Sequence, residues 1–404
     1  MSGIFKGRTF FRKSPLKRSY DVVIIGGGAH GTATAYYLAK NFGITNVAIL
    51  EMNYIGAGGS GRNTTIIRSN YRTPEGIRFY ERSMELWNNL GAELDFNLML
   101  SRHGHFTLAH TDSSIRVQRE RAEFNQSLGV DSRLVFRDEI RELCPELNLS
   151  MDVPYPVLGA LYHPPGAVLR HDAVVWGYAS KANEAGVHIH QGVKVTGIRK
   201  DANGRCIGVD TSEGPIDAGI VMSAVAGWTT QITDLAGIAT PITNHPLQAL
   251  VTEPVKPALH KIMVSSVLHT YVSQTDRGEF LIGSAIEPYT TYSMRSTYTF
   301  LQHAVPNTLQ LFPWLGRMKI QRQWTGYCDM TPDFSPIMGE TPVENFYLDA
   351  GWGTWGFKAS AVCGETMAEM LATRKVPKLI EPFRLSRFEE EKLVPEKAAA
   401  SVGH

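Results

Sequence analysis

The stretch "YDVVIIGGGAHGTATAYYLAKNFG", residues 20–43, decides the fold of this protein. It runs from an apolar segment through a glycine-rich turn into an alanine-rich segment, and the apolar run "NVAILE", residues 46–51, follows. This order predicts a strand, a helix and a second strand, which together form a βαβ unit. Gly26, Gly28 and Gly31 fit the pattern G-x-G-x-x-G between the first strand and the helix. The sequence therefore predicts a Rossmann-like dinucleotide-binding domain.

The three glycines and the acid after the second strand each have a physical role in such a domain. The first glycine allows a tight turn, the second lets a pyrophosphate approach the backbone, and the third lets helix and strand pack closely. Glu51 ends the second strand, where a carboxylate can accept hydrogen bonds from ribose hydroxyls. The alternative is a solvated charge at a strand end. These residues alone leave open whether the dinucleotide is NAD or FAD.

The loop that follows separates the two cofactors. "GAGGSGRNTTIIRSNYR", residues 56–72, is rich in glycine and hydroxyl groups and comes directly after the predicted adenosine-binding acid. Such a loop can surround the second set of phosphate and ribitol oxygens that an extended FAD offers, whereas an NAD enzyme more often continues into another βαβ crossover. We therefore expect FAD.

Composition excludes several other classes of protein. The 404 residues are 43% hydrophobic and 20% charged, with 40 basic and 39 acidic side chains, so no charge excess points to nucleic acid or to a membrane surface. No apolar run approaches the roughly 20 residues that cross a bilayer. The four cysteines lie far apart, so we expect neither a disulfide framework nor a metal site, and a cytoplasmic location fits.

Changes in the predicted secondary structure along the chain indicate a discontinuous domain organisation. Strand-like and helical stretches mix without a repeat, and a β-rich region lies before the last glycine-rich turn. The fold class is therefore α/β or α+β. The predicted parts are a basic N-terminal arm at 1–19, an FAD-binding domain at 20–90, 155–240 and 330–376, a substrate domain at 91–154 and 241–329, and a C-terminal tail at 377–404.

"FYLDAGWGTWGFK", residues 346–358, predicts a strand, a glycine turn and a helix that begins near Ala359. Backbone N–H groups and the helix dipole at such a turn favour negative charge, which a reduced flavin carries at its N1–C2=O edge. The alternative is a turn that only packing requires. Lys358 favours the functional interpretation, because a lysine at a helix start opposes the dipole.

Several motifs together resemble a known family. "DVVIIGGGAHGTATAYYLA", "GRNTTIIRSNY", "VKVTGI", "MTPDFSPIMG" and "FYLDAGWGTWGFK" are similar to the amine-oxidising, FAD-dependent family that includes glycine oxidase, dimethylglycine oxidase and sarcosine oxidase. The resemblance covers residues 20–387. Within the family, "RHD" before a helix, "HPLQALV" and "GWGTWGFK" most resemble beta subunits of heterotetrameric sarcosine oxidases. The resemblance implies an FAD-binding domain of the glutathione-reductase and D-amino-acid-oxidase type, with a sheet-rich substrate domain.

The resemblance also implies which residues hold the FAD, with the backbone of Val195 at the adenine and the turn near Lys358 at the isoalloxazine. Gly326 stands where single-chain sarcosine oxidases have the cysteine that attaches FAD, so we expect non-covalent FAD and a buried thiol at Cys328. The implied cofactor-binding residues are Gly26, Gly28, Ala29, His30, Gly31, Glu51, Arg62, Asn63, Thr64, Thr65, Ile66, Val195, Gly353, Gly356 and Lys358.

An N-methyl amino acid carries a carboxylate that must be held so that its methyl group faces the flavin. Arg68 and Lys358 are the best candidates for this clamp, since a guanidinium binds a carboxylate through two nitrogens and an ammonium adds a point charge. Arg72 is the alternative arginine, and either arginine can instead be a surface ion-pair residue. The reaction itself requires no general base.

The resemblance implies a second flavin, FMN, attached covalently to His171 at the boundary with an alpha subunit. Sarcosine would reduce FAD, and the electrons would pass through FMN to oxygen and give hydrogen peroxide. The one-carbon unit would leave as formaldehyde or on tetrahydrofolate. Partner chains alpha, gamma and delta would hold NAD, zinc and the folate site. From the residues alone, Asp172 is the better helix N-cap, which leaves the imidazole of His171 free of that role.

Two alternatives stay open. A related complex would oxidise N-methylglutamate, dimethylglycine or an opine, and side chains from the β-rich domain would select among them. A non-catalytic subunit would bind the flavin only as a scaffold, and then Arg68 and Lys358 could be replaced without loss of activity.

Overall fold

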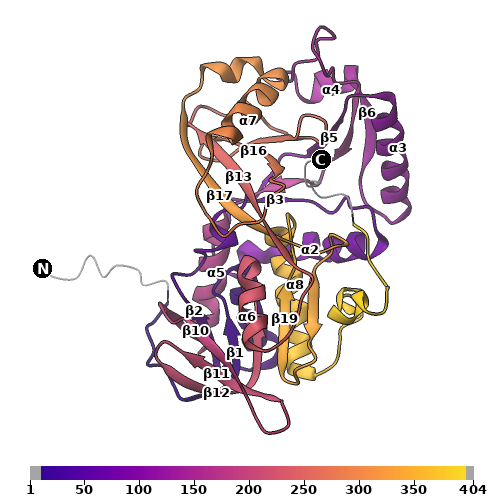
Figure 1. The fold of residues 1–404 in the computed structure, drawn as a ribbon. Coiled ribbons are helices and arrows are strands. Elements are labelled where there is room, and N and C mark those ends of the chain that lie inside the picture. Colours follow the sequence, from indigo (N-terminus) through magenta and orange to yellow (C-terminus); the bar gives the residue numbers. More distant parts are fainter. Residues whose placement is uncertain (1–10, 397–404) are drawn as a thin grey trace, which may run out of the picture.

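The computed structural model describes residues 11–396, so residues 1–10 of the predicted arm and 397–404 of the predicted tail lie outside it. The molecule has two lobes (Figure 1), one with a largely parallel sheet and its helices and the other around a second, largely antiparallel sheet. Within the described range, no helix combines the length and the apolar character that a bilayer crossing needs.

The first lobe is a mostly parallel sheet with an antiparallel hairpin at one edge. β9, β2, β1, β12 and β19 run parallel to one another, and β18 pairs antiparallel with β19 at one edge. β11 pairs antiparallel with the N-terminal part of β12, residues 214–217, and β10 pairs with β11. The strands are β1 (Ser19–Ile25), β2 (Val47–Glu51), β9 (His188–Gln191), β10 (Val195–Lys200), β11 (Cys206–Thr211), β12 (Gly214–Ser223), β18 (Ile337–Glu340) and β19 (Phe346–Ala350).

The apolar run of β1 is buried on both faces, as a central parallel strand requires. Val22 and Ile24 join the core beneath the helices, whereas Val23 and Ile25 join the core on the hairpin side. This alternation follows from the two-residue period of a strand. The helices are α1 (Ala29–Phe42), α2 (Pro74–Glu93), α5 (His171–Glu184) and α8 (Gly356–Thr373) on the first side and α6 (Thr229–Leu235) on the second.

The second lobe is an eight-stranded sheet in the order β17-β13-β16-β15-β14-β5-β7-β6. β7 belongs to it although it lies in the segment 155–240, which we assigned to the FAD-binding domain, and the domain boundaries stay a prediction. The strands are β5 (His105–Ala109), β6 (Arg133–Phe136), β7 (Gly159–His163), β13 (Thr243–Thr252), β14 (Ile262–Ser265), β15 (Thr270–Gln274), β16 (Phe280–Ile286) and β17 (Ile320–Met330).

The two faces of this sheet have different neighbours. Phe106 of β5 packs in a core with α4 (Arg137–Leu143) and α7 (Tyr298–Leu311), whereas Thr107 lines a large cavity on the opposite face. α3 (Asp112–Ser127) follows β5 directly. A small sheet of β3 (Ile66–Ile67), β8 (Ala167–Val168) and β4 (Ser101–Arg102) completes the chain's strands in the described range.

Contacts without room for a side chain fix α1 against its neighbours. A Cβ on Gly31 would lie 2.1 Å from the carbonyl oxygen of Gly26, and one on Gly364 of α8 would lie 2.5 Å from the Cβ of Ala33. Real Cβ atoms do not approach other atoms so closely. The start of α1 therefore packs directly against the glycine turn, and α8 packs directly against α1. The predicted fold class, a Rossmann-like α/β part with a sheet-rich part, is confirmed.

We predict that Gly364→Ala destabilises the protein by about 1–3 kcal/mol, because the new methyl group must push α8 away from α1. Denaturant unfolding of the flavin-loaded protein measures this. Gly91→Ala is the matched control, since its Cβ would meet its nearest atom at 3.4 Å, an ordinary contact, within α2. Equal stability of the two variants would contradict the packing argument.

Candidate active site

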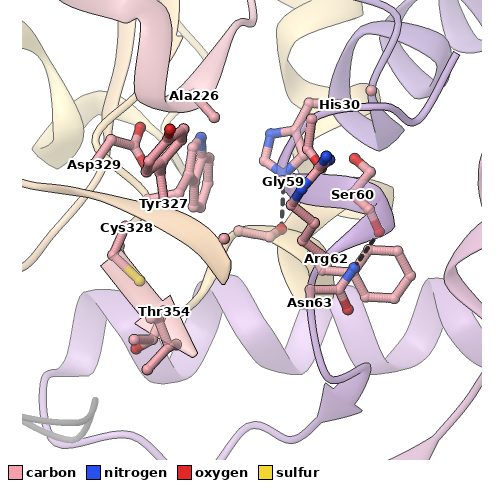
Figure 2. A pocket seen from close by; sticks show the side chains of 18 of the residues that line it. His30, Gly59, Ser60, Arg62, Asn63, Ala226, Tyr327, Cys328, Asp329 and Thr354 are labelled. Atoms are coloured by element: carbon pink, nitrogen blue, oxygen red, sulfur yellow. Dashed lines mark hydrogen bonds between the residues drawn. The ribbon is translucent and has the colours of Figure 1, made fainter. Parts of the chain in front are cut away.

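A cavity of about 1030 Å³ lies between the two sheets and runs from the end of β2 to the first turn of α8. In Figure 2, Ser60, Arg62 and Asn63 lie on one side, and Tyr327, Cys328 and Asp329 lie on the other. Most of the residues predicted from sequence line it: Gly26, Gly28, His30, Glu51, Arg62, Asn63, Thr64, Thr65, Ile66, Arg68, Arg72, Val195, Gly353, Gly356 and Lys358.

The glycine turn forms one end of the cavity. Gly28 is the N-cap of α1 and carries no side chain that could cap it, and the N–H of Ala29 donates to Ser60 Oγ at 2.8 Å. Glu51 Oε2 accepts the N–H of Gly27 at 2.9 Å, which fixes the carboxylate beside the turn. Of the predicted residues, Ala29 and Gly31 do not line the cavity, and Gly31 acts through packing.

The loop 56–72 crosses the middle of the cavity and is fixed by its own side chains. Arg62 donates to the carbonyl groups of Ala57 and Gly58, and its own carbonyl accepts from Trp324 Nε1 at 2.8 Å. Asn63 Oδ1 accepts the N–H of Thr65 at 2.7 Å and stabilises its left-handed backbone, φ 58°. The loop is therefore tied to β17 and presents its backbone and hydroxyl groups to the cavity.

A second glycine turn closes the other end of the cavity. Gly351 and Gly353 both have positive φ, and Asp329 accepts their N–H groups through its Oδ2 at 2.7 Å and its carbonyl at 3.1 Å. Burial raises the pKa of Asp329 to about 6. α8 begins at Gly356, three residues before the start we expected near Ala359.

His30 connects the two glycine turns. Its Nδ1 lies 2.9 Å from Asp349 Oδ2 and its Nε2 lies 2.7 Å from the carbonyl of Gly356, so both ring nitrogens face acceptors. Burial opposes the charged ring, but the Asp349 carboxylate outweighs this and raises the pKa of His30. Asp349 also accepts from Trp352 Nε1 and Cys363 Sγ. These groups form a hydrogen-bonded cluster that joins α1 to the first turn of α8.

Two basic side chains lie near the start of α8, the buried Arg68 and the partly buried Lys358. Arg68 is buried, with one nitrogen 2.8 Å from Asn70 Oδ1 and its guanidinium 4.5 Å from the ring centre of Tyr71. Burial lowers the pKa of Lys358 well below its usual value, and the charge of Arg68 lowers it further. Among the described residues, the cavity-lining carboxylates are Glu51, Asp329 and Asp349. Glu51 and Asp329 accept backbone N–H groups of the two glycine turns, and Asp349 pairs with His30.

Arg72 is less suited to this cluster than Arg68. Its side chain is exposed, although it reaches the cavity rim. Its backbone N–H donates to the carboxylate of Glu396, a fully buried residue that also accepts from Thr73 at the start of α2. The backbone of Arg72 therefore helps to tie residues of the C-terminal segment to α2.

Sequence reasoning missed several residues of the cavity. Arg121, Gln118, His105 and Tyr271 are buried or line its wall from the second lobe. Polar residues recur at helical spacing in α3, at Gln118, Arg121 and Asn125. A prediction from hydrophobic periodicity alone assigns such a polar stripe to the solvent-exposed face of a helix. Ser60 could have been predicted as a site residue from the stretch "GGSGRN", because it is a hydroxyl-bearing residue within a glycine-rich loop.

His171 does not line this cavity. It is the first residue of α5, and the N-cap is Arg170, which makes no side-chain cap bond. Our expectation that Asp172 is the N-cap was wrong, because the helix already begins at His171; the Asp172 carboxylate accepts the N–H of Ala173 at 2.9 Å and pairs with Arg170 at 2.8 Å. Burial lowers the pKa of His171, which favours the neutral ring.

The residues present fit an extended dinucleotide. A Cβ on Gly28 would lie 3.0 Å from Ser60 Oγ, so the glycine keeps the helix N-terminus open to a pyrophosphate. The cavity then continues past the loop 56–72 to the turn at Gly353, well beyond the glycine turn at Gly26 and Gly28. Cys328 is a buried free thiol, as expected. The fold and this site define a flavin-dependent oxidoreductase.

Comparison with known proteins identifies the family. Residues 21–370 match the model of the FAD dependent oxidoreductase family, and the chain belongs to this family. It is 44% identical over 388 residues to sarcosine oxidase subunit beta of an Arthrobacter species, and the aligned region covers 96% of this chain and 96% of the relative. It is also 44% identical over 387 residues to the subunit of that name from Rhizobium meliloti strain 1021, covering 96% of this chain and 92% of the relative.

A solved structure supports the same assignment. The crystal structure of L-proline dehydrogenase from P. horikoshii matches with a TM-score of 0.87 at 30% sequence identity, and covers 94% of this chain and 100% of that one. The predicted resemblance to sarcosine oxidase beta subunits, the FAD-dependent oxidoreductase activity and FAD as a cofactor are confirmed.

We predict that Glu51→Leu weakens FAD binding by about tenfold or more, because the turn at Gly27 loses its acceptor and the ribose loses a partner. Flavin content and FAD titration of the apoprotein measure the loss. Glu93→Leu, in α2 and outside the cavity lining, is the control. Unchanged FAD affinity in Glu51→Leu would remove this residue from the site.

Proposed function

We propose that the chain oxidises sarcosine within a multisubunit complex. With non-covalent FAD bound, the C–H bond of the N-methyl group would break with transfer of its electron pair to the flavin, and water would add to the carbon to give glycine and formaldehyde or, with tetrahydrofolate, a folate-bound one-carbon unit. FMN would supply the route by which the two electrons, with two protons, reach oxygen and give hydrogen peroxide. The observation that carries the proposal is the pair of basic side chains beside the glycine turn of α8, the buried Arg68 and the partly buried Lys358.

The residues of the chain have separate tasks. Bound FAD supplies the two-electron acceptor. Arg68, held by Asn70 and stacked on Tyr71, binds the substrate carboxylate, and Lys358 adds a second donor. The exposed side chain of Arg72 takes no part in the clamp. The N–H groups near Gly353 and the start of α8 favour the negative charge that the flavin gains.

The protonation of Lys358 couples to carboxylate binding. Burial and the charge of Arg68 lower its pKa in the free protein. A bound carboxylate favours the ammonium and raises that pKa again. Carboxylate affinity is therefore full below the pKa of Lys358 in the free protein and falls as the pH rises through it. Substrate binding takes up a proton over this range.

Covalent FMN at His171 belongs to the same proposal. The neutral ring would hold FMN through a bond from its nitrogen to the 8α-methyl carbon, formed with release of a proton and with oxygen as the oxidant that removes two electrons. The N–H of Arg170 donates to the carbonyl of Leu98 at 3.0 Å, and the segment 95–98 helps to line a second cavity of about 460 Å³. The helix that begins at His171 is therefore hydrogen-bonded to a segment that lines this second cavity.

The word "beta" in the names of the relatives implies a complex of several chains. We infer that alpha, gamma and delta subunits complete it and carry NAD, zinc and the folate site. The four cysteines of the chain are free, which fits a reducing compartment such as the cytoplasm. L-proline oxidation is the second candidate activity, because the L-proline dehydrogenase named above has the same fold at 30% identity and proline is also a secondary amine with a carboxylate.

The discriminating experiment is anaerobic mixing of the assembled complex with sarcosine or L-proline while the flavin absorbance is recorded. We predict that sarcosine bleaches the flavin and is turned over to glycine with a higher kcat/KM than proline. Bleaching by proline alone would shift the assignment to the second candidate. Bleaching by neither amine would support the scaffold alternative.

We predict that Lys358→Met weakens acetate binding at neutral pH by about tenfold, because a charged donor is lost. Flavin absorbance during acetate titration measures the dissociation constant. In the wild type this constant rises with pH, whereas in Lys358→Met and in the permanently charged Lys358→Arg it stays flat. The same pH dependence in all three proteins would show that another group titrates.

We predict that His171→Ala abolishes covalent flavin but leaves the FAD-dependent bleaching by sarcosine. Acid precipitation of the complex, followed by mass measurement of the flavin-bearing peptide, tests this. His188→Ala, on β9, is the control and retains the attached flavin. Attached flavin that persists in His171→Ala would exclude this residue as the attachment point.

A further inference from the structure

α3 buries a polar stripe against the cavity wall. Gln118, Arg121 and Asn125 are all at least nine-tenths buried, at positions three and four residues apart along the helix. Asn125 Nδ2 donates to the carbonyl of Tyr71 at 2.8 Å, which ties the helix to the loop that carries Arg68. Gln118 and Arg121 line the cavity. This face of the helix therefore packs polar groups where a helix usually packs apolar ones.

Arg121 and Arg68 lie next to each other because they share one acceptor. The carbonyl oxygen of Asn70 accepts from Arg121 Nε at 3.0 Å and from a second nitrogen of the same guanidinium, and it also accepts from Arg68 at 3.2 Å. The side-chain oxygen of Asn70 accepts from Arg68 as well. Asn70 is fully buried, so one residue holds two guanidinium groups side by side.

This arrangement is electrostatically unfavourable without an anion. Burial lowers the pKa of Arg121 well below its usual value, and the charges of Arg68 and Arg72 lower it further. Within residues 11–396, Arg121 makes no ion pair with a carboxylate. The charge of Glu396 offsets part of this cost at Arg121, and an anion that enters the cavity would offset more of it.

Unpaired polar atoms in the same part of the structure also point to a ligand. Gln118 Oε1, His105 Nδ1 and Asn70 Nδ2 are buried and have no hydrogen-bond partner within the described residues. Gln118 and His105 both line the cavity. Buried polar groups in native proteins are nearly always paired, so a bound molecule or its water accounts for these atoms.

We propose that Arg121 is a second guanidinium of the carboxylate site and that Asn70 is the positioning residue that holds it beside Arg68. The inference rests on the proposed function, because it assumes a substrate with a carboxylate. It deepens that function by naming the substrate class: amines that carry a carboxylate, bound by two guanidinium groups and Lys358, in preference to uncharged N-methylamines.

The test uses the flavin-loaded complex and two readouts. Acetate titration, followed by flavin absorbance, measures carboxylate binding alone, and anaerobic reduction by sarcosine separates affinity from the limiting rate. Arg121→Met is expected to raise both the acetate dissociation constant and the sarcosine KM by about 10- to 100-fold, while the limiting reduction rate changes less than about threefold. Arg121→Lys restores part of the affinity, because it returns the charge without the planar pair of nitrogens.

Control variants separate this role from a structural one. Arg119→Met changes an exposed arginine of the same helix and is expected to leave both constants within about twofold. Asn70→Ser removes the side-chain oxygen that holds Arg68 but keeps the main-chain carbonyl that holds Arg121, so it is expected to raise both constants through Arg68 alone. If Arg121→Met does not yield folded protein, Arg121→Gln provides the same comparison, because it also removes the charge.

The outcomes are distinct. Wild-type acetate affinity in Arg121→Met or, failing its expression, in Arg121→Gln overturns the inference even if sarcosine is oxidised. Weakened acetate binding in a complex that does not oxidise sarcosine supports the carboxylate site and rejects the proposed substrate. A fall in the limiting rate with unchanged acetate binding also overturns the inference, since it assigns Arg121 a structural effect on the flavin.

Discussion

Close contact between α1, the glycine turn and α8 is the constraint on which the rest of the structure depends. Gly31 and Gly364 leave no space for a side chain, so the N-termini of α1 and α8 are brought to the same cavity. His30 then bonds to Asp349 and to the first turn of α8, which links the two ends electrostatically. The helix ends that favour a pyrophosphate and a reduced flavin are thus set by packing rather than by flexible loops.

The second physical theme is positive charge at the far end of that cavity. Lys358 comes from α8, Arg68 from the loop after β3, and Arg121 from α3, so three distant segments supply one site. Aromatic stacking of Tyr71 on Tyr80 and on Trp355, with ring centres 4.2 Å and 4.7 Å apart, joins two of these segments. The low pKa of Lys358 shows the electrostatic cost of the cluster, which a carboxylate ligand offsets.

The sequence predicted the parts that depend on local pattern. The βαβ unit and the glycine turns follow from periodicity and from glycine spacing, because strand, turn and helix are adjacent along the chain. Most of the predicted site residues line the cavity, although Val195 and the residues of the loop at 62–66 were implied by the family resemblance. Arg121 and Asn70 could not be found in this way, because their roles arise from contacts between α3 and a loop about fifty residues earlier. The contact of Glu396 with the start of α2 is equally long-range. The start of α5 was misjudged by two residues, because Arg170 and not Asp172 occupies the N-cap position.

The central claim is that the buried cations bind the carboxylate of an amino acid substrate beside the flavin. A crystal structure of the FAD-loaded complex grown with acetate tests it most directly. The account predicts an acetate whose oxygens lie about 2.7–3.1 Å from nitrogens of Arg68, Lys358 and Arg121. An acetate bound instead at the exposed Arg72, or FAD filling the space between these three side chains, would contradict it.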